Sequence, residues 1–373
     1  MLEHGGRLRE ASRRHAIPLA DWVDLSTGIA PWPYPLPPLA AELWQRLPED
    51  DDGLREAAAG YYGVTNDGVT DDGVSDVARI LPLAGSQAAI QALPRLRAAG
   101  TVAMPMPTYG EYAPAWRAAG HRVIECAFAS LVAQDADVVL LANPNNPDAR
   151  RLDRAALLAL AARLARRGGW LIVDEAFADA DVADATISLA AVAGGAAAPN
   201  VIVLRSLGKF FGLAGARVGF CIAAPALLDR LRDLLGPWPL ANPSRHVARQ
   251  CLCDAPWQAA QRERLRQALA RLCALLTEHG LPPSATTALF AYVPCHASSH
   301  VSCATAASVQ EHLARRGILV RHFAAPAALR FGLPGDEAAW TRLGAALREL
   351  PREPSRVSQR VTDGAAVAAR VAG

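Results

Sequence analysis

The chain has 373 residues, which at roughly 150 residues per domain corresponds to two or three structural units with enough apolar side chains for a core. Hydrophobic residues make up 51%, charged residues 20%, and the formal net charge is +2, so the composition excludes a disordered chain and gives no electrostatic reason to expect nucleic acid as a partner. Seven cysteines, an odd number, exclude a complete disulfide framework and favour a reducing compartment.

Neither the N-terminal residues nor the most apolar stretch of the chain is predicted to enter a membrane. Residues 1–20 carry charges throughout and have no apolar block, unlike a secretory signal. The most apolar long stretch, residues 185–204, is mainly Ala and Gly and is interrupted by Pro199 and Asn200, which predicts a loop and a strand. We therefore expect a cytoplasmic protein with no membrane partner.

The predicted elements up to residue 236 alternate strands with helices. Residues 1–38, which hold six prolines from Pro18 to Pro38, are predicted to form an N-terminal arm. Residues 39–236 are predicted to form a large domain whose mostly parallel sheet is covered by helices, because short apolar runs alternate with amphipathic segments. A helix is clearest at residues 153–167, with Asp153 as its N-cap. The predicted strands are residues 80–83, 101–104, 122–125, 138–142, 170–173 and 201–204.

The pattern changes after Pro239. A helix over residues 258–279, with leucines at three- and four-residue intervals, precedes predicted strands at 288–293, 318–321 and 329–333. Further helices are predicted near residues 309–316 and 336–350. The sequence thus predicts an α/β protein with a smaller C-terminal domain at residues 237–350 and a flexible polar tail at residues 351–373.

Lysine occurs once in the chain, at position 209, among 38 Lys and Arg residues. A coding bias toward arginine accounts for the other positions. Arginine stays protonated and is a poor nucleophile, whereas a lysine amine can lose its proton and add to a carbonyl group. The exception therefore indicates a covalent role for Lys209.

Polar or glycine-containing segments follow four of the predicted strands, at the sheet edge where open parallel sheets bind ligands. Asp174 ends an otherwise buried strand, where a carboxylate is costly unless it meets a cation such as a protonated pyridine nitrogen. The four segments are residues 85–87 (Gly-Ser-Gln), 143–147 (Asn-Pro-Asn-Asn-Pro), 174–175 (Asp-Glu) and 205–209 (Arg-Ser-Leu-Gly-Lys).

One of these segments suits a phosphate. The backbone N–H groups of Gly85, Ser86 and Gln87, at the start of a predicted helix, would face an anion, although a capped helix start looks the same in sequence. Ser206 and Arg217 would add a hydroxyl and a guanidinium to the same anion.

The order and spacing of these motifs resemble the fold-type I pyridoxal phosphate enzymes of the aminotransferase family. The matching runs are GSQ at 85–87, PTY at 107–109, NPNNPD at 143–148, DEAF at 174–177 and SLGKFFGLAGARVGF at 206–220. The resemblance implies pyridoxal 5′-phosphate as cofactor, attached to Lys209, with Asp174 at the ring nitrogen so that the ring acts as an electron sink. It also implies that Tyr109 stacks on the ring and is catalytic, and that Asn146 bonds the 3-oxygen. The phosphate ligands it implies are Gly85, Ser86, Gln87, Ser206 and Arg217.

Two positions depart from the family pattern. Phe177 stands where relatives usually have a tyrosine that also bonds the 3-oxygen, and Leu47 where a tyrosine crosses a dimer interface to the phosphate. Each departure removes one hydrogen bond to the cofactor, about 1 kcal/mol. The resemblance therefore predicts that the properties of the bound cofactor change more than its affinity does. It also implies a homodimer.

Further motifs are His4-Gly5-Gly6, DLSTGIAP at 24–31, Tyr61-Tyr62-Gly63, GILVR at 317–321 and LRFGLP at 329–334. Together they resemble the cobalamin-pathway branch of the family, the threonine-phosphate decarboxylases. This resemblance implies that a phosphorylated amino acid binds with its α-carboxylate on Arg330 and its phosphate on Arg321, under His4 of the arm. Gly5, Gly28 and Asn146 are the other implied substrate contacts.

The implied reaction turns L-threonine O-3-phosphate into (R)-1-amino-2-propanol O-phosphate, with Lys209 a candidate to reprotonate Cα. Histidinol-phosphate aminotransferase shares the core motifs and is the alternative, because only the bond held perpendicular to the ring separates the two reactions. A non-catalytic cofactor-binding protein is the alternative of another class.

Several single residues also have structural explanations. Tyr109 fits a packed turn aromatic, and Arg217, Arg321 and His4 fit solvated charges. Residue types that can bind a metal cluster at Cys295, His296, His300 and Cys303. Such clusters are more often incidental than zinc sites, so no metal is predicted.

Overall fold

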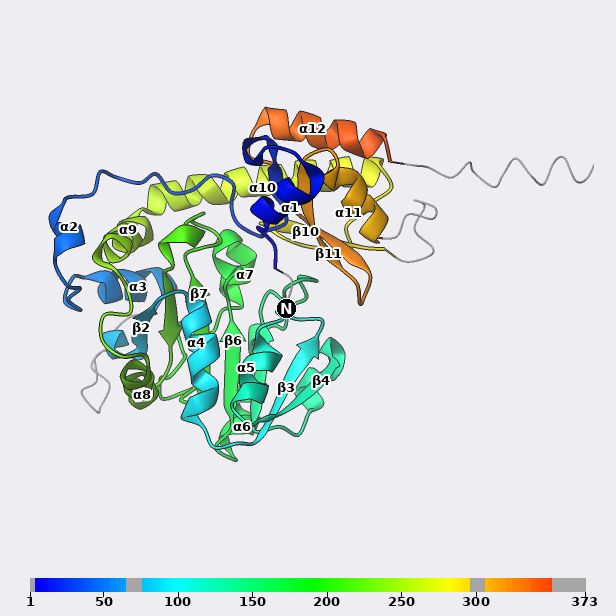
Figure 1. Cartoon of the computed structure of the whole chain (residues 1–373). Helices are drawn as coiled ribbons and strands as arrows, with labels where there is room; N and C mark the ends of the chain where they lie inside the picture. Colours follow the sequence, from blue (N-terminus) through cyan, green and yellow to red (C-terminus); the bar gives the residue numbers. More distant parts are fainter. Residues whose placement is uncertain (1–3, 65–75, 296–305, 351–373) are drawn as a thin grey trace, which may run out of the picture.

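The computed structural model describes residues 4–64, 76–295 and 306–350 (Figure 1). Two sheets organise these residues, one of seven strands in the order β2-β8-β7-β6-β5-β3-β4 and one of five in the order β1-β11-β12-β10-β9. The long helix α10 (Ala255–Glu278) runs along the top of the larger domain into the smaller one (Figure 1). The predicted α/β architecture, with a larger mostly parallel sheet and a smaller C-terminal sheet, is confirmed.

The seven-stranded sheet contains every strand predicted between residues 80 and 204. Strands β3 to β7 pair in parallel, whereas β8 is antiparallel to its neighbours β2 and β7. Strand β8 was not predicted from the sequence, because its first two residues, Gly219 and Phe220, belong to the run interpreted as a binding motif. The strands are β2 (Ile80–Leu83), β3 (Thr101–Met106), β4 (Arg122–Ala127), β5 (Val138–Ala142), β6 (Trp170–Asp174), β7 (Val201–Ser206) and β8 (Gly219–Ile222).

Helices cover both faces of this sheet, which explains why its central strands are apolar on both sides. In β5, Val139 and Leu141 enter one core cluster, whereas Val138 and Leu140 enter the other. Each such side chain stabilises the fold by roughly 1.5–3 kcal/mol when fully buried. The helices of the first cluster include α3 (Leu54–Tyr62), α6 (Arg154–Ala165) and α9 (Asn242–Cys253), and those of the second are α4 (Ser86–Ala92), α5 (Tyr112–Ala118) and α8 (Pro225–Leu235).

The helix predicted at residues 153–167 is α6. The side chain of Asp153 accepts a hydrogen bond from the N–H of Ala156 at 2.7 Å, so this residue is the N-cap, as the sequence predicted. The remaining short helices of this part are α2 (Glu42–Gln45), α7 (Val182–Thr186) and 3-10 turns at Asp76–Arg79, Leu93–Leu96, Phe128–Ala133, Ala178–Ala180 and Ala214–Ala216.

The smaller domain is built on the second sheet. Its core strand β12 is buried at every position and lies between β11 and β10, both antiparallel to it. The elements are β9 (Ala285–Thr287), β10 (Phe290–Pro294), β11 (Ile318–Phe323), β12 (Ala328–Gly332), α11 (Ala306–Ala314) and α12 (Glu337–Arg348). The predicted tail, residues 351–373, lies outside the described residues.

The N-terminal segment joins this smaller sheet. It holds α1 (Leu8–His15), a 3-10 turn (Leu19–Asp21) and β1 (Val23–Leu25), and β1 pairs in parallel with β11. Figure 1 shows the arm, in dark blue, folded against the smaller domain before it crosses to α2 at the far side of the larger one. The arm therefore reaches both domains.

Helices in the described ranges all fall short of the combined length and apolarity that a bilayer span requires.

Candidate active site

The nine residues predicted to hold the cofactor line one pocket, which we call the lysine pocket. It opens at the carboxyl ends of β5, β6 and β7, beside the start of α4. The nine are Gly85, Ser86, Gln87, Tyr109, Asn146, Asp174, Ser206, Lys209 and Arg217. These residues come from the ends of five strands, β2, β3, β5, β6 and β7, and meet there because the strands end at the same sheet edge.

The phosphate end of the lysine pocket depends on a missing side chain. Gly85 has φ +77°, and a Cβ added to it would lie 2.7 Å from Nη2 of Arg217. The guanidinium of Arg217 therefore packs over the backbone that begins α4, with Nη1 donating to the carbonyl of Ala214 at 3.3 Å. The hydroxyl of Ser206 lies in the same pocket and accepts from the N–H of Gly208 at 3.2 Å. The N–H of Gly85 donates to the carbonyl of Leu83 at 2.7 Å. The guanidinium, the hydroxyls and the first N–H groups of α4 form an anion-binding donor set.

Asp174 ends β6 with a buried carboxylate, 6% exposed. Burial raises the pKa of this carboxyl group, whereas hydrogen bonds and the charge of Lys209 act in the opposite direction. Oδ2 accepts from the hydroxyl of Tyr112 at 2.8 Å and Oδ1 from the N–H of Ala176 at 3.0 Å. Sequence reasoning missed Tyr112, because its part in the site depends on how α5 turns its side chain inward.

Lys209 follows β7 and lies in the lysine pocket opposite this carboxylate. Burial lowers the pKa of its amine to about 8, and repulsion by Arg330 and Arg217 adds to this effect, while Asp174 opposes it. Nζ lies 5.5 Å from the ring centroid of Phe177. A lysine amine is a nucleophile only when neutral, so this environment makes the amine more reactive near neutral pH than one in water.

Tyr109 and Asn146 line the same pocket as Asp174 and the residues of the phosphate end. The hydroxyl of Tyr109 donates to Oε1 of Gln87 at 3.2 Å, and burial raises the pKa of this hydroxyl to about 12. Oδ1 of Asn146 accepts a hydrogen bond from Nη1 of Arg330 on β12. The smaller domain thus contacts the lysine pocket directly.

Arg330 is buried, 6% exposed, between the two domains. Its Nη2 donates to the carbonyl of Ser26 at 3.0 Å, and Nε is buried with no hydrogen-bond partner in the described structure. Burial, followed by repulsion from Arg321, lowers its pKa to about 10. A buried cation with an unsatisfied donor suits an anionic group of a ligand.

A second pocket, here called the arm pocket, adjoins this arginine. It is lined in part by His4, Gly5, Ser26 and Arg321. The guanidinium of Arg330 donates to the carbonyl of Ser26, which lines the arm pocket, and to Asn146, which lines the lysine pocket. The two pockets therefore lie on either side of this guanidinium.

His4 connects the arm to the mouth of the lysine pocket. Its Nε2 lies 2.7 Å from Oε1 of Glu111, and its ring centroid 6.2 Å from that of Tyr109. Gly28 lines neither pocket: a Cβ there would lie 2.7 Å from Cε1 of Phe177, so the structure places this glycine against that ring.

The two departures from the family pattern have different surroundings. Phe177 is buried in the lysine pocket and packs edge-on against Phe290, with centroids 5.2 Å apart. Leu47 is 60% exposed on the chain between α2 and α3.

A buried charged cluster, which the sequence analysis treated only as polar strand ends, lies behind the lysine pocket. Nη1 of Arg205 donates to Oε2 of Glu175 at 2.5 Å, and Nη2 pairs with Asp179. The hydroxyl of Ser188 and the N–H of Leu189 also donate to Glu175. This cluster joins the ends of β6 and β7, which carry Asp174 and Lys209.

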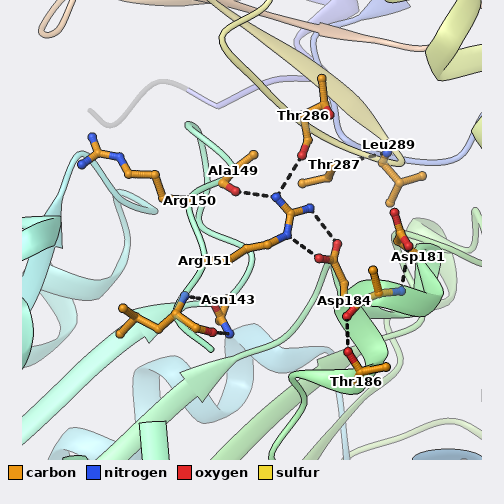
Figure 2. A network of polar contacts seen from close by, with 12 residues as sticks. Asn143, Ala149, Arg150, Arg151, Asp181, Asp184, Thr186, Thr286, Thr287 and Leu289 are labelled. Carbon is orange, nitrogen blue, oxygen red and sulfur yellow. Dashed lines mark hydrogen bonds and ion pairs between the residues drawn. The ribbon is translucent and has the colours of Figure 1, made fainter. Parts of the chain in front are cut away.

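The loop that carries Asn146 is tied to both domains by Arg151 (Figure 2). Its guanidinium pairs with Asp184 on α7 and donates to the carbonyls of Ala149, at 2.7 Å, and Thr286, at 3.1 Å (Figure 2). Thr286 belongs to β9, so one side chain joins the cofactor loop, the larger domain and the smaller sheet.

Groups of three or more metal-ligand side chains are absent from the described ranges. Of the cluster considered in the sequence, Cys295 is described and partly buried, whereas His296, His300 and Cys303 lie outside the described residues.

The fold and the lysine pocket define a class of protein, and comparison with known proteins agrees. Residues 46–347 match the family Aminotransferase class I and II, and the chain belongs to this family. Within it, the chain is 53% identical to the threonine-phosphate decarboxylase of Pseudomonas aeruginosa over 93% of its length and 97% of that protein's. It is 41% identical to the threonine-phosphate decarboxylase of Sinorhizobium sp, over 93% and 98%. The predicted resemblance to that branch is therefore confirmed.

A solved structure supports the same architecture. The histidinol-phosphate aminotransferase of Sinorhizobium meliloti, solved in complex with pyridoxal-5′-phosphate, superimposes with a TM-score of 0.75 at 21% identity, covering 94% of this chain and 95% of that one. The predicted fold type I is confirmed.

The predicted cofactor, pyridoxal 5′-phosphate, is confirmed by the family, and the residues present fit it. The side chain missing at Gly85 leaves the cradle beside Arg217, the donor set suits a phosphate, and a buried carboxylate and amine lie farther along the pocket.

Substitution of Gly85 tests the phosphate cradle. We expect Gly85→Ala to weaken pyridoxal phosphate binding at least about tenfold, because the new Cβ displaces Arg217, a charge-assisted donor. Fluorescence titration of the apoprotein measures the dissociation constant. Gly236→Ala is the matched control, since Gly236 also has φ +77° but no atom within 4 Å of the added Cβ. Equal weakening in both variants would contradict the assignment.

Proposed function

We propose that the protein is a lyase that decarboxylates L-threonine O-3-phosphate to (R)-1-amino-2-propanol O-phosphate. The Cα–carboxylate bond breaks, CO₂ leaves, and a proton is added at Cα. The observation that carries the proposal is the pairing of Arg321 and Arg330, directly opposite each other on β11 and β12, beside a pocket that holds a low-pKa lysine. The named relatives, 53% and 41% identical, support the same reaction.

Two cations at this spacing suit a substrate with two anionic groups. Side chains directly opposite in an antiparallel pair share a face and lie close together, and like charges there are destabilising. Repulsion by Arg321 contributes to the lowered pKa of Arg330. A ligand with a carboxylate and a phosphate would neutralise both. We assign the α-carboxylate to Arg330 and the phosphate to Arg321, with His4 and Gly5 in the arm pocket.

We assign each residue of the site a separate role in the reaction. Bound pyridoxal phosphate supplies an electron-accepting ring conjugated with the substrate nitrogen. Asp174 would balance the positive charge of the ring nitrogen, and Tyr109 would pack against the ring. Lys209 would hold the cofactor through its amine and would carry the proton to Cα. Asn146 would bond the 3-oxygen, while Arg330 would orient the carboxylate of the substrate.

Transamination of a phosphorylated amine is the second candidate, because the histidinol-phosphate aminotransferase structure shares the fold. That reaction consumes an amino acceptor and releases no CO₂. Histidinol phosphate has no α-carboxylate, so it would leave one of the paired arginines without its anion.

We also propose that the enzyme is a cytoplasmic homodimer that serves cobalamin synthesis by supplying the aminopropanol phosphate linker of the nucleotide loop. The stretch around α2 supports a dimer, since Leu36, Trp44 and Leu47 are 64%, 68% and 60% exposed. Apolar side chains gathered on one exposed segment are typical of an interface, and α2 lies at the far edge of the larger domain in Figure 1. The six described cysteines are free thiols, as in a reducing compartment.

A two-substrate assay tests the reaction. With pyridoxal phosphate and L-threonine O-3-phosphate, we expect CO₂ and 1-amino-2-propanol phosphate in equal amounts, with no need for 2-oxoglutarate. Lys209→Ala should abolish turnover, the yellow colour and any borohydride-reducible adduct. Turnover of histidinol phosphate that depends on 2-oxoglutarate and releases no CO₂ would instead identify an aminotransferase.

Substitution of Arg321 tests the phosphate assignment. Arg321→Met should lower kcat/KM for threonine phosphate about 10- to 100-fold, the size expected for a lost charge-assisted hydrogen bond, and should change kcat/KM for unphosphorylated threonine less than about twofold. Arg266→Met is the control, because Arg266 is exposed on α10 and pairs only locally with Glu263. An equal loss on both substrates would contradict a role in phosphate binding.

Light scattering tests the dimer. We expect twice the chain mass of 39.4 kDa for the purified protein. The double variant Trp44→Ser with Leu47→Ser should weaken association, whereas Val182→Ser, which changes a side chain 65% exposed on α7, should not. A monomeric wild-type protein at micromolar concentration would rule the dimer out.

A further inference from the structure

Tyr112 lies beneath the lysine pocket and was not among the predicted site residues. It is the first residue of α5, it is 1% exposed, and it lines the pocket. Its hydroxyl donates to Oδ2 of Asp174 at 2.8 Å. A fully buried tyrosine hydroxyl thus contacts the carboxylate assigned to the cofactor ring nitrogen.

The hydrogen bonds of Asp174 come from two directions. The N–H of Ala176 reaches Oδ1 at 3.0 Å, and Tyr112 reaches Oδ2. Donors to both oxygens favour the ionised carboxylate, against the desolvation that favours the neutral acid. The other charged or titratable groups acting on Asp174 are Lys209 and Arg205, both cationic, and Tyr109 across the pocket.

Tyr112 remains a donor throughout the working pH range. Burial, followed by the charge of Asp174, raises the pKa of its hydroxyl well above the ordinary value of 10.0. Its ring also meets the ring of Tyr109 edge-on, with centroids 5.3 Å apart and planes at 78°. One side chain therefore contacts both groups assigned to the cofactor ring, Asp174 and Tyr109.

We propose that Tyr112 is a positioning residue whose hydroxyl keeps Asp174 ionised and directed at the ring nitrogen of pyridoxal phosphate. The inference rests on the role assigned to Asp174 above. Without the hydroxyl, Oδ2 has one donor fewer in a buried site, so the carboxyl group takes up a proton at higher pH and balances the charge of the ring nitrogen less well. Tyr112 contacts no reacting atom and acts through Asp174.

Cofactor binding to the apoprotein provides a test that needs no substrate. Tyr112→Phe removes the hydroxyl and keeps the ring. We expect it to weaken pyridoxal phosphate binding about tenfold, as for a lost bond to a charged group, while binding of the analogue whose ring nitrogen is replaced by C–H changes less than about twofold. Equal weakening for both ligands, or for neither, would overturn the proposal.

Tyr34→Phe is the matched control. The hydroxyl of Tyr34 donates to Oδ2 of Asp254 at 3.1 Å, so this variant also removes a tyrosine-to-aspartate hydrogen bond, but outside the lysine pocket. We expect both dissociation constants to stay unchanged. Weakening that is selective for the natural cofactor in this control would overturn the proposal, because the effect would then not come from Asp174.

A double-mutant cycle isolates the coupling. In the Asp174→Asn background, Tyr112→Phe should change the ratio of the two dissociation constants less than about twofold, because the carboxylate through which it acts is gone. The same selective loss in this background would refute the role. All these measurements concern cofactor binding, so their outcome does not depend on the decarboxylase assay. The proposed reaction can fail while the Tyr112 effect is found, and the Tyr112 effect can fail while the reaction is found.

Discussion

Buried charges at the ends of β6 and β7 determine how these two strand ends are placed relative to each other. Glu175 and Asp179 are buried beside Arg205, and no solvent remains to satisfy any of the three. A pair of this kind adds little stability by itself, but the removal of one partner typically costs about 3–5 kcal/mol. The chain must therefore bring the two strand ends into register. Asp174 and Lys209 lie on those same ends, so the demand for charge pairing behind the pocket also fixes the carboxylate and the amine within it.

The two domains meet through the loop after β5. Asn146 of this loop accepts from Arg330 of the smaller sheet, and Arg151 donates to the carbonyl of Thr286 on the same sheet. The loop is therefore held by both domains. It begins at Asn143, directly after the buried strand β5. An anion that engages Arg330 would bind the same guanidinium that donates to Asn146 of the lysine pocket. If Arg330 binds the substrate carboxylate as proposed, one side chain contacts both the substrate and the loop that carries Asn146.

Signals that are local in sequence predicted most of this architecture. The six strands from β2 to β7 were predicted because an apolar run between turn residues shows directly in the sequence. Lys209 was predicted because a single lysine stands among arginines, and the other cofactor residues because polar strand ends coincide with the motifs of the family. Strand β1, three residues long, forms only by pairing with β11 almost 300 residues later in the chain. Tyr112 and Arg205 look like an ordinary helix aromatic and a strand-end charge, and only packing shows what they contact. Gly28 was expected at the substrate, and the structure shows that its missing side chain leaves room for Phe177, which lines the lysine pocket.

The choice between losing CO₂ and losing a proton depends on the rotation about the bond from Cα to the substrate nitrogen. A ligand held at one anionic group alone keeps that rotation free. Arg321 and Arg330 belong to one antiparallel ladder whose spacing is fixed by backbone hydrogen bonds, whereas Asp174 ends strand β6 of the other sheet and Lys209 follows strand β7 of that sheet. A substrate held at both its carboxylate and its phosphate by the smaller sheet, and at its nitrogen by the larger one, has three fixed points. Three fixed points determine which bond at Cα faces the ring, which a single arginine does not.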